Sequence, residues 1–224
     1  MEGYHVDAGP LVAGETVYTG SVEGDRFREL CLLAIDTASG AIRWKRPVTL
    51  PAMAAPAIDS GRVFFTLSNG KLNRDAEKPA GAVCCADAGT GALLWEIVTS
   101  GGVYASPVCW KERVFVAGGA GVCRCLRRHD GGEVWQTPLR ERIVASPVVS
   151  GGGMLVLTER GQLIKLDAAT GWIFWRFERM EEYVTSGDVY ASPILVRRRV
   201  YVCAGGHLFC IGDRREGEAP AEPR

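Results

Sequence analysis

The sequence predicts an all-β protein made of repeated units of four short antiparallel strands. Four tryptophans recur at intervals of 51, 40 and 40 residues, each at the end of a similar eleven-residue pattern; they are Trp44, Trp95, Trp135 and Trp175. Glycine makes up 28 of the 224 residues and proline 11, which is typical of a chain with many turns. No segment carries a sustained apolar period of 3.6 residues, so we expect no long helix.

The composition excludes several classes of protein. The chain balances 26 Lys and Arg against 26 Asp and Glu, and 47% of its residues are hydrophobic. This apolar content is too high for a wholly disordered chain. Because the net charge is zero, the chain has no excess of basic residues to bind a phosphate backbone, and we expect no nucleic-acid partner. No apolar run approaches the roughly 20 residues of a membrane-spanning helix, so we expect no transmembrane segment.

Each repeat is expected to contain four strands in a fixed order. A run led by proline forms the first strand, because a strand start needs no backbone donor for the ladder. These prolines are Pro10, Pro56, Pro107, Pro147 and Pro193. An apolar run follows as the second strand, at 17–20, 63–66, 114–117, 154–157 and 200–203. The third strand ends at the start of the next turn, and the fourth strand contains the tryptophan.

The eleven-residue pattern predicts a tight hairpin between the third and fourth strands. Aspartate can accept hydrogen bonds from its own turn, and glycine can take the positive φ that closes it. The motif positions are Asp36, Gly40, Trp44, Asp87, Gly91, Trp95, Gly131, Trp135, Asp167, Gly171 and Trp175. The third copy departs from the pattern, with Arg127 in place of the aspartate and Asp130 in place of Ser or Thr. We therefore expect its turn to be held differently.

Four-stranded units of about 40–50 residues that pack radially describe a β-propeller. One tryptophan per unit fits this architecture, because a large flat ring can fill the space between neighbouring sheets. The pattern Ala-x-Asp-x-x-Thr-Gly-x-x-x-Trp resembles the tryptophan-docking motif of PQQ-like β-propeller repeats, and four copies in register cover about residues 8–213. Similar repeats occur in the lipoprotein subunit of the outer-membrane β-barrel assembly machine, in quinoprotein dehydrogenases and in sensor regions attached to Ser/Thr kinases.

The repeat divides the chain into a lead-in at 1–7, a propeller at 8–213 and a tail at 214–224. We expect the tail to be disordered, because it consists almost entirely of Glu, Ala, Pro and Arg. The predicted blades are 8–49, 52–99, 102–139, 142–178 and a partial fifth at 190–213 that lacks its tryptophan strand. The resemblance implies seven or eight blades, so four complete blades and a partial one predict an incomplete, open ring. Its exposed end blades are expected to contact a protein partner or a second copy.

Cys84 and Cys85 are the only candidates for binding a cofactor. Some quinoprotein dehydrogenases place a disulfide between adjacent cysteines over the quinone, so the resemblance draws attention to this pair. The repeat gives a simpler interpretation, because Cys85 occupies the position of Ala34 and Cys125, where a small residue lies under the tryptophan. A quinoprotein also needs a calcium site and a catalytic aspartate, and no residue here matches those motifs.

We therefore expect no catalytic residue, no metal and no cofactor, and the sequence favours a non-catalytic protein-interaction or scaffold module. The alternative is a fragment of a quinoprotein dehydrogenase that uses PQQ and calcium. A candidate interaction face comprises Tyr104 and Tyr190, which precede equivalent Ala-Ser-Pro segments, together with His5 at a similar repeat position. The other interpretation of these three residues is packing at turns.

The family and the N-terminus give different expectations for localisation. The resemblance implies the periplasm or the cell envelope. The first residues carry neither the positive charge nor the apolar run of a signal peptide. If Met1 is the true start, we expect a cytoplasmic protein.

Overall fold

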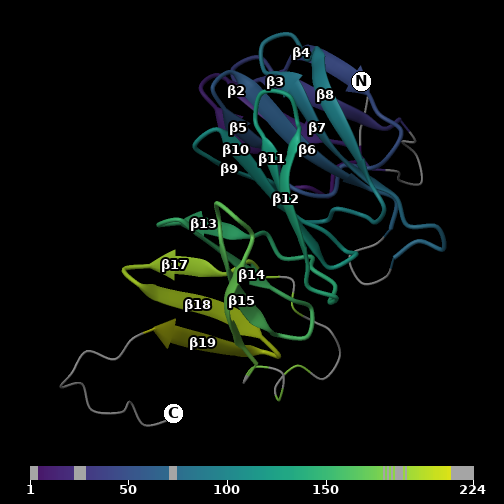
Figure 1. Ribbon diagram of the computed structural model, residues 1–224. Coiled ribbons are helices and arrows are strands. Elements are labelled where there is room, and N and C mark those ends of the chain that lie inside the picture. Colours follow the sequence, from purple (N-terminus) through teal and green to yellow (C-terminus); the bar gives the residue numbers. More distant parts are fainter. Residues whose placement is uncertain are drawn as a thin grey trace.

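The computed structural model describes residues 5–22, 29–70, 75–178, 180, 182, 184, 189 and 191–212. Within these residues the chain forms nineteen strands and no helix, arranged in five antiparallel sheets that follow one another along the chain (Figure 1). The described residues therefore also contain no helix with the length and hydropathy needed to cross a bilayer. The predicted tail and Tyr190 lie outside the described residues, as does most of the lead-in.

We number the sheets one to five in chain order. Sheet one contains β1 (Leu11–Ala13), β2 (Thr16–Gly20), β3 (Cys31–Asp36) and β4 (Ile42–Pro47). Sheet two contains β5 (Ala57–Asp59), β6 (Arg62–Ser68), β7 (Gly81–Asp87) and β8 (Leu93–Thr99). Sheet three contains β9 (Val108–Trp110), β10 (Arg113–Ala117), β11 (Val122–Arg127) and β12 (Glu133–Pro138). Sheet four contains β13 (Val148–Ser150), β14 (Gly153–Leu157), β15 (Leu163–Asp167) and β16 (Ile173–Phe177). Sheet five contains β17 (Ile194–Val196), β18 (Arg199–Ala204) and β19 (His207–Gly212).

Every sheet is an up-and-down meander, because strands that follow each other in the sequence are the ones that pair. The first strand of each sheet begins directly after the proline that the sequence singled out, as Leu11 does after Pro10. The first strands of sheets two, three and four contact one another. The proline-led strands therefore lie innermost, and the tryptophan strands form the outer edge of each sheet.

The hairpin before each tryptophan strand has the predicted geometry. In sheet two, Asp87 Oδ1 accepts hydrogen bonds from the backbone N–H and the hydroxyl of Thr90, both at 2.8 Å. Gly91 closes the turn at φ +71° and donates its N–H to the carbonyl of Asp87 at 2.9 Å. The first and fourth copies hold their turns in the same way. The third copy differs as expected, because Arg127 Nε pairs with Asp130 Oδ1 at 3.0 Å.

The hydrophobic core lies between neighbouring sheets rather than within any one of them. Four apolar clusters fill the four gaps between sheets one and five. Successive side chains of a strand point to opposite faces, so Phe64 of β6 packs toward sheet three beside Val114, whereas Phe65 packs toward sheet one beside Leu32. Each sheet therefore contributes both of its faces to burial, which is the packing expected of propeller blades.

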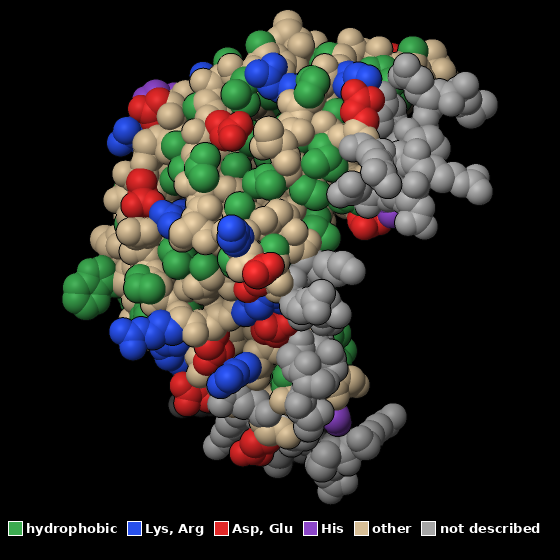
Figure 2. All heavy atoms as spheres, turned by 90° about the vertical axis from the view of Figure 1, so that its right-hand side faces the viewer, with side chains coloured by type: hydrophobic (Ala, Val, Ile, Leu, Met, Phe, Trp, Pro, Cys, Tyr) green, Lys and Arg blue, Asp and Glu red, His purple; other side chains and the backbone are tan. Residues whose placement is uncertain are grey.

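The five sheets form an open arc and do not close a ring. Sheet one lies at one end of the arc and sheet five at the other, and the two sheets do not meet (Figure 1). The space-filling view shows a curved outline that is hollowed on one side (Figure 2). Sheet five has three strands in the part of the chain that is described. The predicted fold class, four complete four-stranded blades plus a partial fifth in an open ring, is therefore confirmed.

Candidate functional site

Three of the four motif tryptophans dock on the hairpin of the next sheet. Trp44 Nε1 donates a hydrogen bond to the carbonyl of Ala88 at 2.9 Å, and its ring lies against Gly91. A Cβ added to Gly91 would stand 2.6 Å from a ring carbon, so only glycine allows this approach. Equivalent bonds join Trp95 to the carbonyl of Arg128 at 3.0 Å and Trp135 to that of Ala168 at 3.2 Å.

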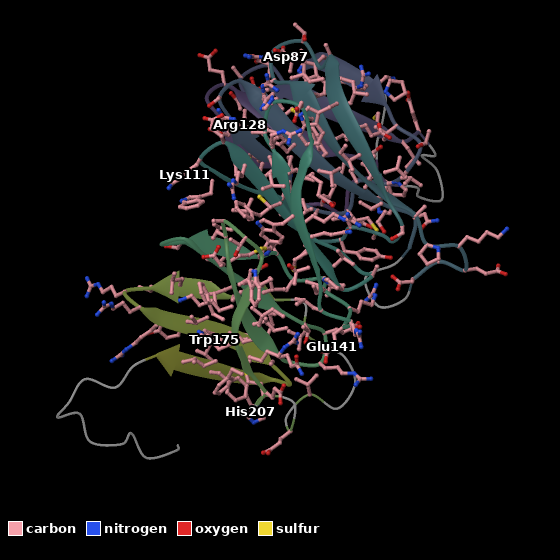
Figure 3. All side chains as sticks on the ribbon, viewed as in Figure 1. Asp87, Lys111, Arg128, Glu141, Trp175 and His207 are labelled. Carbon is pink, nitrogen blue, oxygen red and sulfur yellow. The ribbon has the colours of Figure 1, made fainter. Side chains whose placement is uncertain are left out.

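Within the part of the chain that is described, Trp175 of sheet four has no such hairpin to dock on. The side chains of Trp44, Trp95 and Trp135 are 8%, 8% and 9% exposed, whereas that of Trp175 is 37% exposed. Among the described residues, Trp175 Nε1 has no hydrogen-bond acceptor. Figure 3 shows Trp175 beside the strands of sheet five, with whose residues it lines a pocket. The same tryptophan position is therefore docked on a hairpin in three interfaces and partly exposed in the fourth.

Two arginines strengthen the docked interfaces. Arg62 Nη1 donates to the carbonyl of His129 at 2.9 Å, and Arg113 Nη1 donates to that of Ala169 at 3.0 Å. Both arginines stand at the first position of the second strand and reach the hairpin of the next sheet. In sheet four the same position is Gly153, which cannot make this contact.

Serine residues join the inner strands in a way that we did not expect from the sequence. The backbone N–H of Ser106 donates to Ser146 Oγ at 2.9 Å, and the backbone N–H of Ser146 donates to Ser192 Oγ at 3.0 Å. Sheet two has Ala55 at the equivalent position. The repeated Ser-Pro dipeptide was the available signal, but the partner of each hydroxyl lies about 40 residues away.

The residues of the candidate interaction face lie in different surroundings. Tyr104 is buried, donates its hydroxyl to Asp75 Oδ1 at 3.1 Å and packs under the Arg142 guanidinium, 4.8 Å from its ring centroid. His5 is exposed, and its Nε2 lies 3.2 Å from Asp7 Oδ1. Tyr190 lies outside the described residues. The burial of Tyr104 supports a packing role for this residue, and the shared interaction face stays a prediction.

Cys84 and Cys85 occupy opposite faces of β7 and do not form a disulfide. Burial raises the pKa of the Cys85 thiol to about 11. Burial and the nearby Glu96 carboxylate raise the pKa of the Cys84 thiol further still, and that thiol lies 3.6 Å from Glu96 Oε2. Each sulfur is packed in a different apolar cluster. The pair therefore lines no open chamber and does not fit the adjacent-cysteine site of a quinone cofactor.

A groove of about 1010 Å³ opens between sheets four and five, where Trp175 lacks its hairpin. Its apolar lining comprises Val148, Leu155, Trp175, Phe177, Leu195, Val200 and Ile211. Its basic lining comprises Lys165, Arg176, Arg197 and Arg198. No Asp or Glu is among the described residues that line it, so the groove is both apolar and positively charged. Elsewhere among the described residues, no group of three or more His, Cys, Asp or Glu side chains is placed to hold a metal ion.

Sheet four departs from the earlier repeats around this groove. Lys165 replaces the small residue that lies under the tryptophan in the other copies, and it lines the groove together with Gly153. Trp172 replaces the alanine or glycine that follows the motif glycine elsewhere, and its side chain is 76% exposed. Phe174 on the same edge strand is also exposed. Sheet four therefore exposes three aromatic side chains near its outer edge, those of Trp172, Phe174 and Trp175.

Comparison with known proteins identifies the repeat. The family model described as outer membrane protein assembly factor BamB matches residues 2–76 and 79–222. The outer membrane protein assembly factor BamB of Yersinia pestis is 32% identical over 110 residues, which cover 42% of this chain and 27% of that protein. The chain spans about half or less of the length of the two curated BamB relatives that it matches.

Solved structures agree on the fold. BamB from Moraxella catarrhalis superposes with a TM-score of 0.65 at 19% identity, over 89% of this chain and 56% of that one. The quinohemoprotein alcohol dehydrogenase from Comamonas testosteroni superposes with a TM-score of 0.70 at 15% identity, over 93% of this chain and 41% of that one. The docked tryptophans, the Asp-to-Gly hairpins and the family match together show that this chain belongs to the outer membrane protein assembly factor BamB family of PQQ-like β-propeller proteins.

Proposed function

We propose that this chain is a non-catalytic protein-interaction module that acts as a scaffold at the cell envelope. The observation that carries the proposal is the distribution of exposed apolar side chains. Sheets one to three bury their docking tryptophans against the following sheet, whereas sheet four leaves Trp175 partly exposed, and sheets four and five also expose Trp172, Phe174, Ile194 and Leu208. Exposed apolar patches of this kind mark binding surfaces. The likeness to proteins named as assembly factors supports an assembly role.

A site-specific crosslinking experiment tests this proposal. A photoreactive phenylalanine analogue replaces Trp172 or Leu208 in the chain expressed in cells of its source. Val98, which is also exposed but lies on sheet two, is the matched control. We expect one discrete protein adduct at positions 172 and 208 and none at position 98. Equal, diffuse labelling at all three positions would overturn the assignment of the end sheets as the interaction surface.

Self-association is one version of the proposal, with a second copy as the partner. Sedimentation of the purified chain over a range of concentrations tests this version. A dimer that grows with concentration and is lost on Trp172→Ser would support it. A compact monomer at every concentration would exclude the second copy and leave a different protein as the partner.

Ligand titration separates the scaffold from the quinoprotein alternative. Anything that binds the folded chain and not the unfolded chain raises the melting temperature. We expect PQQ with Ca²⁺ to leave the melting temperature unchanged, because Cys84 and Cys85 point into separate apolar clusters. A saturable rise in melting temperature would instead support the fragment of a PQQ- and calcium-dependent dehydrogenase.

A further inference from the structure

The groove between sheets four and five lacks a docking hairpin among the described residues. The interfaces with a docked tryptophan show which structural element would cover it. Between sheets two and three, Trp95 donates to a hairpin carbonyl and lies against Gly131, and the strand after that hairpin covers the third strand of its sheet. Between sheets four and five, Trp175 has neither the carbonyl nor the glycine among the described residues. What would complete the groove is therefore a turn followed by an extended strand.

Strand β19 forms the edge of sheet five and has one side without a paired strand among the described residues. β19 pairs only with β18 in the described part of the chain. Its counterpart β3 in sheet one buries four of its six residues, from Cys31 to Ala34, and the other two residues are partly buried. In β19 none of the six side chains is buried, and Leu208 is 70% exposed. An extended segment added at this edge would gain main-chain hydrogen bonds and cover these side chains.

The charge of the groove limits what that segment can be. Four basic side chains line the groove, and no acidic side chain is among the described residues that line it. Arg197 and Arg198 form the tight turn between β17 and β18, both at positive φ, and neither has a carboxylate partner among the described residues. Arg176 Nη1 donates to the amide oxygen of Gln162 at 3.1 Å, which is a neutral partner. Such a surface attracts a negatively charged chain and repels a basic one.

We propose that this groove binds an extended acidic segment of a partner protein, which adds to β19 as a fourth strand and offers a turn carbonyl to Trp175. Every second side chain of the segment enters the groove, and these side chains include both apolar groups, beside Phe177 and Ile211, and carboxylates, which face Lys165, Arg197 and Arg198. The inference rests on the proposed interaction function and gives the chemistry of the partner at the end sheets.

A labelled synthetic peptide tests this inference in the full chain. The probe has the sequence Asp-Ala-Ala-Thr-Gly-Glu-Ser-Val-Ser-Glu-Ser-Val, in which the Glu and Val side chains share one face of the strand, and its binding is followed by fluorescence anisotropy. A second peptide replaces each Glu by Lys, and a third carries N-methyl groups on alternate strand residues. We expect at least a tenfold preference for the acidic peptide over the Lys peptide, weakening as salt is raised. N-methylation on the pairing edge should abolish binding.

Matched variants locate the binding site. Lys165→Gln with Arg197→Asn and Arg198→Asn removes groove charge, and asparagine tolerates the positive φ of the turn. Arg140→Asn with Arg160→Gln is the control, because Arg140 also has a positive φ and both side chains are exposed outside the groove. We expect at least a tenfold loss of affinity in the groove variant and in Trp175→Ala, and no change in the control. Superimposable circular dichroism and melting curves establish that each variant is folded.

Each contrary result has a definite meaning. Equal affinity for the acidic and Lys peptides, or an equal loss in the control variant, would overturn the proposal. Binding that appears only after residues 214–224 are deleted would also overturn it, because the groove would then belong to the chain's own C-terminal segment. If the peptide fails while crosslinks at positions 172 and 208 still form, the groove assignment is wrong and the interaction function stands. If both fail, the proposed function fails as well.

Discussion

The interfaces among sheets one to four and the interface between sheets four and five arise from the same repeat and each holds an apolar cluster, yet only the first three contain a docked tryptophan. Trp95 is almost fully buried and hydrogen-bonded to the next hairpin, whereas Trp175 is 37% exposed and has no acceptor among the described residues. The motif in one sheet therefore supplies only half of a docking site. The other half comes from the following sheet, as in other repeat proteins whose units are stabilised by their neighbours.

The opposite end of the arc has the complementary difference. The turn of sheet one contains Asp36 and Gly40 in the motif positions, but a Cβ on Gly40 would meet no described atom within 4 Å. A Cβ on Gly91 would meet the ring of Trp44. Within the described residues there is thus one turn without a tryptophan and one tryptophan without a turn. The two positions allow the contribution of docking to be measured inside a single molecule.

The largest expected difference between the two regions is in thiol reactivity. Cys203 and Cys210 of sheet five are exposed, whereas Cys85 and Cys123 are buried. Burial raises the pKa of Cys85 to about 11 and that of Cys123 to about 12, so these thiols stay protonated at pH 8 and unreactive. We expect the sheet-five thiols to react with iodoacetamide on the order of a thousandfold faster, because the buried ones need local unfolding.

Mass spectrometry of timed samples measures this difference. In urea all eight cysteines should react at similar rates, which is the control for intrinsic reactivity. Early modification of Cys85 or Cys123 in the native protein would show that sheets two and three open as readily as sheet five.

Removal of the ring should affect the two regions unequally. Trp95→Ala is expected to lower the free energy of unfolding by about 3–5 kcal/mol, the usual cost of emptying a buried aromatic site. Trp175→Ala should cost about 1 kcal/mol, since its side chain is already partly hydrated. Urea unfolding followed by circular dichroism measures both values. Equal losses would mean that the docking turn contributes little to the burial energy of the ring.

The turn glycines provide the next largest contrast. Gly91 and Gly40 have φ values of +71° and +70°, so alanine introduces the same backbone strain of roughly 1–2 kcal/mol at each. At Gly91 the new methyl group would also stand 2.6 Å from the ring of Trp44, which adds about 1–3 kcal/mol of overpacking. Thermal melts of Gly91→Ala and Gly40→Ala should therefore show a larger drop for the former. The reverse order would contradict the docking of Trp44 on that turn.

The smallest effect concerns the pH dependence of the turn. Hydrogen bonds from the hydroxyl and the N–H of Thr90 hold the pKa of Asp87 below its usual value. Because the folded pKa is the lower one, Asp87 stabilises the fold above about pH 4, and this contribution is lost as the pH falls through the folded value. Asp87→Asn should flatten the fall in stability below pH 4, and Thr90→Val should do so in part. Parallel acid-unfolding curves for the three proteins would contradict this origin of the shift.

Much of the fold followed from short-range patterns. The spacing of the tryptophans predicted the sheets, and the prolines marked the first strands. The departure at Arg127 correctly predicted a turn held by a different contact. The serine links between Ser106, Ser146 and Ser192 were missed, because a serine before a proline does not reveal a partner 40 or 46 residues away. Packing of Tyr104 at a turn was one of the two interpretations, but the sequence could not show that Arg142 and Asp75 contact it from other repeats.

The sequence alone determined the repeat, the turn chemistry and the alternation of side chains, because each depends on residues within one hairpin. The tertiary structure decided which copies of the motif are buried and which are open. It also decided where charge gathers, since Lys165 and Arg197 come together in one groove only when sheets four and five pack side by side. The physical reason is that every docking site in this chain is shared between two sheets, so its state depends on contacts that no single repeat contains.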